Sequence, residues 1–242
     1  MNSETVPRAD GEQQTPSVSK SQIWTLVAVV VLVGGILAAV SFTNRTLSKN
    51  MNIMGFRGWQ IYITLGLGMG GGPKSGEKLE AGKDISEMRF ENSSDYFSVL
   101  LDGEHMNTPD WSPYVESLSY WGLAGAGVPA KEGAGRLTAE NNAWTIAANI
   151  TDDMPDIIPV LITRNVDPTS LIPGAGALSA QRIRPSARFK TPLGNRGFVI
   201  IRKGVGVFRG KFGSSDRLDI IYQGQDTQDI RAALQKIEYL AP

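Results

Sequence analysis

Residues 21–44 form an unbroken run of 24 residues without a charged side chain, and this run constrains the fold more than any other part of the sequence. Within it, Ile23–Phe42 would form a helix of about 30 Å at 1.5 Å per residue, the thickness of the hydrocarbon core of a bilayer. The apolar region of a signal peptide is shorter, about 7–15 residues, and a small-residue cleavage site follows it. We therefore predict an uncleaved transmembrane helix over residues 21–44.

The predicted span contains small residues that could let a second helix approach. Small side chains allow close contact between the backbones of transmembrane helices, although they are also common in ordinary spans. The candidate packing residues are Gly34, Gly35, Ala38 and Ala39. Basic residues occur on both sides of the span, so counting positive charges does not orient it.

The charge-free run divides the chain into further segments. Residues 1–20 are polar and are predicted to be a disordered tail. Residues 45–67 keep apolar residues three or four apart, which predicts an amphipathic extension of the same helix. This extension is expected to be weakened at two glycines, and its stretch 59–65 has a buried strand as the alternative. These residues are Leu47, Met51, Met54, Ile61 and Leu65, with Gly55 and Gly58 as the glycines.

Residues 68–242 are predicted to form one α+β domain with an antiparallel sheet. A helix over Ser94–Leu101 begins after Asn92 or Ser93 as the N-cap. Apolar runs over 143–150, 157–163, 198–202 and 205–209 indicate strands, the last two joined by a hairpin at Lys203-Gly204. The alternation over Thr227–Leu240 predicts a C-terminal amphipathic helix.

The stretch Gly66–Ser75, GLGMGGGPKS, resembles two phosphate-binding patterns without completing either. A P-loop needs backbone N–H groups around the phosphate and a helix that starts at its lysine. Pro73 stands where the motif has its second glycine, and proline lacks the N–H group. We interpret the glycines as the flexible exit from the long helix. A nucleotide-binding enzyme that uses Lys74 is the less favoured hypothesis.

Composition leaves little room for metal or nucleic-acid chemistry. The chain has no cysteine and one histidine, His105, and its 24 basic residues balance 24 acidic ones. We predict no catalytic, cofactor-binding or metal-binding residues and no nucleic-acid partner. One alternative stays open, because the turn TDDMPD could offer oxygen ligands to Ca²⁺ but lacks the pattern of an EF-hand. Its carboxylates are Asp152, Asp153 and Asp156.

The region 107–134 combines loop-forming residues with aromatic side chains. These aromatic residues are Trp111, Tyr114, Tyr120 and Trp121. They could form a partner surface, which would make the protein a membrane-anchored extracytoplasmic binding module. Burial in a small core is the simpler alternative.

Several short motifs, in order along residues 57–210, resemble a group of prepilin-like proteins related to type IV pilins and type II secretion pseudopilins. The motifs are RGWQIYITL, NSSDYFSVLLD, GAGVPA, LTAENNAWTI, PDIIPVLITRN and RGFVIIRKGVGVFR. The resemblance implies a pilin-like fold: a long N-terminal helix, half in the inner membrane and half packed on a small antiparallel sheet, with a periplasmic domain. It also implies a non-enzymatic role in assembly or protein transport, with other pilin-like subunits or secretion components as partners.

The N-terminal motif of such proteins is incomplete in this chain. Prepilins carry a glycine at the cleavage site and a glutamate that later helps assembly. When the sequences are aligned on Thr25-Leu26, the glycine position is Ile23 and the glutamate position is Ala28. We therefore expect a chain that keeps its anchor, and its polymerisation is an open question.

Overall fold

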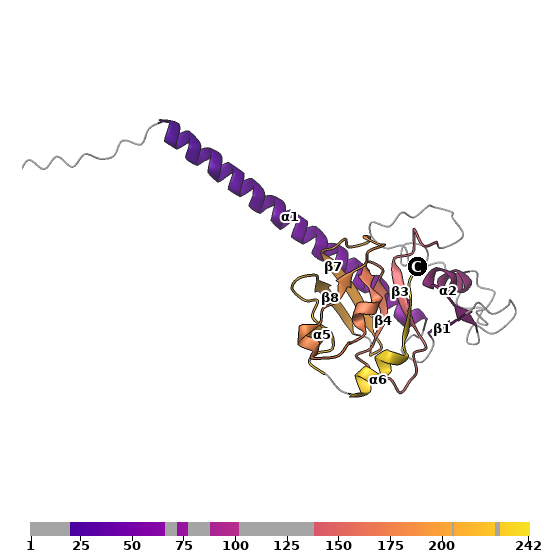
Figure 1. Cartoon of the computed structure of the whole chain (residues 1–242). Coiled ribbons are helices and arrows are strands. Elements are labelled where there is room, and N and C mark those ends of the chain that lie inside the picture. The colour runs from indigo at the N-terminus through magenta and orange to yellow at the C-terminus, as the bar shows by residue number, and fades with distance from the viewer. Residues whose placement is uncertain (1–19, 66–71, 77–87, 102–137, 205, 226–227) are drawn as a thin grey trace, which may run out of the picture. The chain divides into compact units, whose positions relative to one another are not determined.

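The computed structural model describes residues 20–65, 72–76, 88–101, 138–204, 206–225 and 228–242 (Figure 1). The chain divides into two compact units, Met1–Arg45 and Thr46–Pro242. In the described residues, every strand belongs to the second unit. The predicted tail falls outside the described residues except for Lys20.

Helix α1 (Lys20–Thr64) runs without a break over 45 residues, so one helix contains the charge-free run and the predicted extension 45–67 as far as Thr64. The alternative of a strand over 59–65 is wrong. Ile61 and Tyr62 are buried while Trp59 and Ile63 are exposed, which is the pattern of a helix with one face on a core. Among the residues that the structure describes, no helix combines the length and the apolarity needed to cross a membrane.

A five-stranded antiparallel sheet lies at the centre of the second unit, with the strand order β8-β7-β4-β3-β9. Its strands are β3 (Trp144–Ala148), β4 (Pro159–Thr163), β7 (Gly197–Arg202), β8 (Val207–Lys211) and β9 (Glu238–Leu240). β3 pairs with β4, and β7 pairs with β8 in a hairpin whose connection includes Lys203-Gly204. The second strand of this hairpin begins at Val207, two residues later than predicted. The predicted α+β class with an antiparallel sheet is confirmed.

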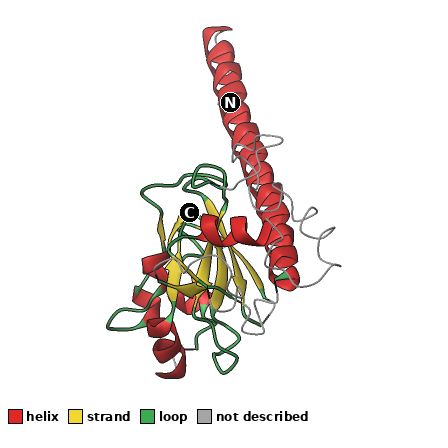
Figure 2. Cartoon of the chain, turned by 90° about the vertical axis from the view of Figure 1, so that its right-hand side faces the viewer, coloured by secondary structure: helices red, strands yellow, loops and turns green. Residues whose placement is uncertain are grey.

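Both faces of this sheet are covered, and every residue of β3, β4 and β7 is buried. Residues 46–64 of α1 cover one face, where Met54 and Ile61 are fully buried. The short helices α5 (Leu218–Ile221) and α6 (Gln228–Lys236) lie on the other side, as Figure 2 shows. Burial on two faces explains why the strands read as continuous apolar runs instead of alternating ones.

Three glycines allow α1 to approach the sheet closely. A Cβ built on Gly58 would lie 2.7 Å from Cη2 of Trp144 in β3, and one on Gly197 in β7 would lie 2.8 Å from Sδ of Met51. At Gly55 the obstacle would be the guanidinium group of Arg209, also at 2.7 Å. Gly55 and Gly58 were predicted to weaken the helix, but α1 passes through both because they make room for its partners.

The smaller elements surround the sheet. Helix α2 (Ser93–Leu101) begins as predicted, because Asn92 Oδ1 accepts the backbone N–H of Asp95 at 2.8 Å. Ser93 Oγ donates to the carbonyl oxygen of Trp144 at 2.7 Å and so ties α2 to β3. The remaining elements are β1 (Lys74–Ser75), β2 (Arg89–Phe90), β5 (Val166–Asp167), η3 (Pro168–Leu171), η4 (Leu178–Ala180) and β6 (Arg184–Pro185).

The predicted helix over Thr227–Leu240 is wrong at its C-terminal end. α6 ends at Lys236, and β9 pairs antiparallel with β3 through Ile146↔Leu240 and Ala147↔Tyr239. Ile230 and Leu234 are buried, so the predicted apolar face of the helix is correct as far as α6 extends. The strand forms because β3 would otherwise present an unpaired edge.

Candidate functional site

The described part of α1 before Arg45 exposes large apolar side chains. Phe42 is 72% exposed and Val31 is 68% exposed. The full set is Val29, Val31, Leu32, Val33, Ile36, Val40 and Phe42. A helix surrounded by water normally carries polar residues over its exposed surface, so a contiguous apolar surface of this kind marks an interaction with an apolar partner or a membrane.

The candidate helix-packing residues fall in this same part of α1. Gly35 and Ala39 are exposed, and a Cβ built on Gly35 would meet none of the described atoms within 4 Å. The side chains at positions 34 and 38 lie outside those that the structure describes. Gly35 and Ala39 are therefore available to a second helix, while the packing role of all four residues stays a prediction.

A second exposed apolar group lies on α1 within the globular unit. Phe56, Trp59 and Ile63 are exposed, and the rings of Phe56 and Trp59 stack with their centroids 6.2 Å apart. Residues at spacings of three and four share one side of a helix. The side of α1 that faces away from the sheet thus carries a short aromatic strip.

The acidic turn is built around a lysine. Lys203 directly follows β7 and is only 7% exposed. Its Nζ donates to the carbonyl oxygens of Asp152 at 2.8 Å and Met154 at 2.9 Å. Asp156 Oδ1 lies 3.9 Å from the same nitrogen. An ammonium group therefore already occupies the side of the turn where these two backbone carbonyl oxygens point. Sequence reasoning placed the turn correctly between two strands but gave no sign of this lysine.

Within the glycine-rich stretch the structure describes residues 72–75, and these do not have the local structure of a phosphate loop. Lys74 and Ser75 form β1, which pairs in parallel with β2, where a P-loop would start a helix. The hydroxyl of Ser75 accepts a hydrogen bond from Asn149 Nδ2 at 2.8 Å, and the Ser75 N–H donates to Asn149 Oδ1 at 3.2 Å. Residues 66–71 lie outside the described residues.

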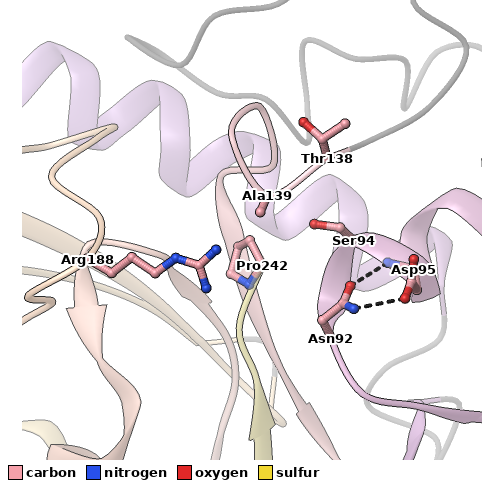
Figure 3. A pocket seen from close by; sticks show the side chains of 7 residues that line it. All are labelled: Asn92, Ser94, Asp95, Thr138, Ala139, Arg188 and Pro242. Carbon is pink, nitrogen blue, oxygen red and sulfur yellow. Dashed lines mark hydrogen bonds between the residues drawn. The ribbon is translucent and has the colours of Figure 1, made fainter.

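A surface pocket of about 470 Å³ lies beside the first turn of α2 (Figure 3). It is lined by Asn92, Ser94, Asp95, Thr138, Ala139, Arg188 and Pro242. Asn92 and Asp95 bond each other on one side, and Arg188 approaches from the other with its guanidinium carbon 4.7 Å from the ring centre of Phe189. The pocket offers one carboxylate and one guanidinium group, without a nucleophile and base in hydrogen-bond contact among these residues.

A second arginine fixes the wall of this pocket. Arg164 Nη1 donates to the carbonyl oxygens of Ala139 at 2.5 Å and Glu140 at 2.9 Å, and its Nη2 donates to Thr191 Oγ1 at 2.6 Å. Burial lowers the pKa of Arg164. Hydrogen bonds from the Thr138 side chain and the Glu140 backbone, followed by the charges of Arg188 and Arg164, lower the pKa of Glu140. The turn at residues 138–141 thus forms a charged rim of the pocket that hydrogen bonds hold in place.

The other residues singled out from the sequence fall outside the part of the chain that the structure describes. The aromatic candidates Trp111, Tyr114, Tyr120 and Trp121 are outside the described residues, as is His105. Among the described residues, no three His, Cys, Asp or Glu side chains are grouped closely enough to hold a metal ion.

Comparison with known proteins adds no assignment: no family model, no curated protein and no solved structure matches this chain.

Proposed function

We propose that this protein is a single-pass inner-membrane protein with a periplasmic globular unit, which acts as a structural or assembly component in a pseudopilin-like system of secretion or pilus type. In this proposal the N-terminal part of α1 is the membrane anchor and residues 46–64 of the same helix carry the globular unit. The protein would then act through contacts with lipid and with other membrane subunits.

The observation that carries the proposal is the apolar surface before Arg45. Residues 21–44 have no charge, and the seven large apolar side chains described there are all exposed. The side chains of 21–27 lie outside the described ones, and the sequence there continues the charge-free run. A run of this length and apolarity is stable in a bilayer and unfavourable in water.

The fold supports the pseudopilin part of the proposal. Residues 46–64 of α1 pack on one face of an antiparallel sheet through Met54, Gly58 and Ile61. This is the arrangement that the resemblance in residues 57–210 implies. The departures at Ile23 and Ala28 concern processing and assembly, so the proposal includes an uncleaved anchor and leaves out a filament.

Two matched lysine substitutions test the anchor. Ile36→Lys places a charge in the middle of the charge-free run, where a bilayer opposes it by about 2.5–3.5 kcal/mol on insertion scales. Ile63→Lys places the same charge at an exposed position of the same helix within the globular unit. The measurement is the fraction of each full chain that stays in the membrane pellet after alkaline carbonate extraction.

We expect the wild type and I63K to remain in the pellet and I36K to shift toward the supernatant. A wild-type chain that carbonate extracts completely would overturn the proposal. Equal retention of I36K and I63K would show that the apolar run is not the anchor.

A further inference from the structure

Four exposed cations lie where strands β7 and β8 contact the first turns of α1 within the globular unit. Lys49 is on α1, Arg196 directly precedes β7, and Arg209 and Lys211 are on β8. We call these four residues the basic patch. Within the described part of the chain, no ion pair or side-chain hydrogen bond engages any of them.

The register of the hairpin places two of these cations beside α1. Gly197 pairs with Lys211 and Val199 pairs with Arg209, and residues paired across strands project from the same face. That face is the one covered by α1, because Gly197 lies against Leu47 and Met51. The guanidinium group of Arg209 reaches the helix at Gly55.

The acidic residues that follow β8 do not neutralise this patch. Asp216 accepts from Arg182 Nη1 at 2.6 Å and from the Gly213 N–H at 2.8 Å. Asp219 is held by Arg217, with Oδ2 2.7 Å from Nη2. The carboxylates that follow β8 thus have other partners, and among the described residues the patch has no acidic partner within ion-pair distance.

The patch is separated from the charge-free run by very little chain. Leu47, which contacts Gly197, is three residues after Asn44, and three residues span at most about 11 Å. The headgroup layer of a bilayer adds roughly 5–8 Å to each side of the hydrocarbon core. In the proposed anchor, Lys49 and the cations beside Gly197 thus lie within about a Debye length of the surface charge of the bilayer, and Arg209, at Gly55, lies about two turns further along α1.

We propose that the basic patch binds the anionic headgroups of phospholipids in the bilayer that anchors the protein, and so holds the β7–β8 end of the globular unit against the membrane. This inference rests on the proposed membrane anchor. The inference goes beyond the anchor, because an anchor alone would not make the position of the globular unit depend on the charge of the lipid.

The absence of cysteine allows a direct test with the full chain. Ser214 is an exposed residue just after β8, and the variant S214C is labelled there with a fluorophore. The labelled chain is placed in phosphatidylcholine nanodiscs with or without phosphatidylglycerol. A constant amount of lipid with a quencher on its headgroup reports how close the label is to the surface. We expect stronger quenching with phosphatidylglycerol, and loss of the difference in about 1 M salt, where the Debye length is about 3 Å.

Two sets of substitutions make the test specific. K49Q/R196Q/R209Q/K211Q removes the basic patch, and K74Q/R89Q/R184Q/K236Q removes four exposed cations from other parts of the same unit. The first set should lower quenching to the phosphatidylcholine level, and the second should leave the wild-type difference intact. The salt series uses the unaltered patch, so the test remains decisive even if the first variant unfolds.

Equal quenching in the two lipids, or a patch variant that behaves as the wild type, would overturn this inference alone. A chain that does not enter nanodiscs at all would instead overturn the proposed membrane anchor. The two failures are therefore distinguishable by whether protein and nanodisc elute together.

Discussion

Gly58 of α1 lies against Trp144 of β3 so closely that a Cβ on the glycine would be 2.7 Å from the indole ring. Gly55, three residues earlier in the same helix, has an equally short distance, but to the flexible guanidinium group of Arg209. The two glycines therefore differ in one respect: the neighbour of Gly58 is a fully buried ring, and the neighbour of Gly55 can move into solvent.

This difference predicts opposite outcomes for alanine at the two sites. Alanine raises helix propensity by about 1 kcal/mol at either position. At Gly58 it also overpacks the core, which costs about 1–3 kcal/mol. We expect G58A to unfold at a lower urea concentration than G55A, because its free energy of unfolding is lower by the cost of overpacking. The measurement is urea unfolding of the detergent-solubilised full chain. Equal midpoints would mean that α1 does not pack on β3 as described.

Lys203 is predicted to be a structural residue. Replacing it by methionine keeps the length of the side chain but removes the donor to the carbonyl oxygens of Asp152 and Met154. A buried acceptor left without a partner costs about 1–3 kcal/mol. K203M should lower the free energy of unfolding by that order, whereas K236M, at an exposed lysine of α6, should change it little. A K203M protein as stable as K236M would contradict this assignment.

Lys203 also affects whether the turn at residues 151–156 can bind Ca²⁺. Two carbonyl oxygens of the turn already accept from the Lys203 ammonium group, and Ca²⁺ requires about 6–8 oxygen ligands. We expect the thermal midpoint of the wild type to be the same with added Ca²⁺ and with a chelator. A midpoint that rises with Ca²⁺ would show that the ion displaces the ammonium group.

Glu140 should contribute to stability above acidic pH. Its pKa is lowered from 4.5, first by the hydrogen bond from the Thr138 side chain. A carboxylate with a lowered folded pKa stabilises the fold above its unfolded pKa, and the contribution is lost as the pH falls through the folded value. We expect E140Q to lose less stability than the wild type between neutral pH and the region below 4.5.

The readout is the urea midpoint as a function of pH. E238Q, at an exposed glutamate of β9, serves as the matched control. If the urea midpoints of E140Q and E238Q both follow the pH dependence of the wild type, the hydrogen bond to Glu140 does not contribute to stability.

Sequence patterns predicted the elements whose signal is long or local. The spacing of Leu47, Met51, Met54 and Ile61 gave the buried face of α1, and Asn92 marked the start of α2. A three-residue strand such as β9 has no periodicity of its own, and only its pairing with β3 defines it. For that reason the sequence suggested a longer helix there.

Contacts between distant residues were not predictable in this way. Lys203 is 51 residues from Asp152 in sequence, so its role in the turn depends on the pairing of β4 with β7. Gly55 and Gly58 were interpreted as helix-weakening residues, because the sequence does not show which distant residue packs against a glycine. The basic patch likewise appears only once β7 and β8 are paired beside α1.

The measurement that tests the central claim most directly is the topology of the full chain. A bacterial alkaline phosphatase, which is active only outside the cytoplasm, is fused after Pro242, and a reporter active only in the cytoplasm is fused at the same place in a second chain. The account predicts an active phosphatase fusion and an inactive counterpart, both held in the membrane fraction. An inactive phosphatase with an active cytoplasmic reporter would contradict it, because the globular unit would then lie on the cytoplasmic side.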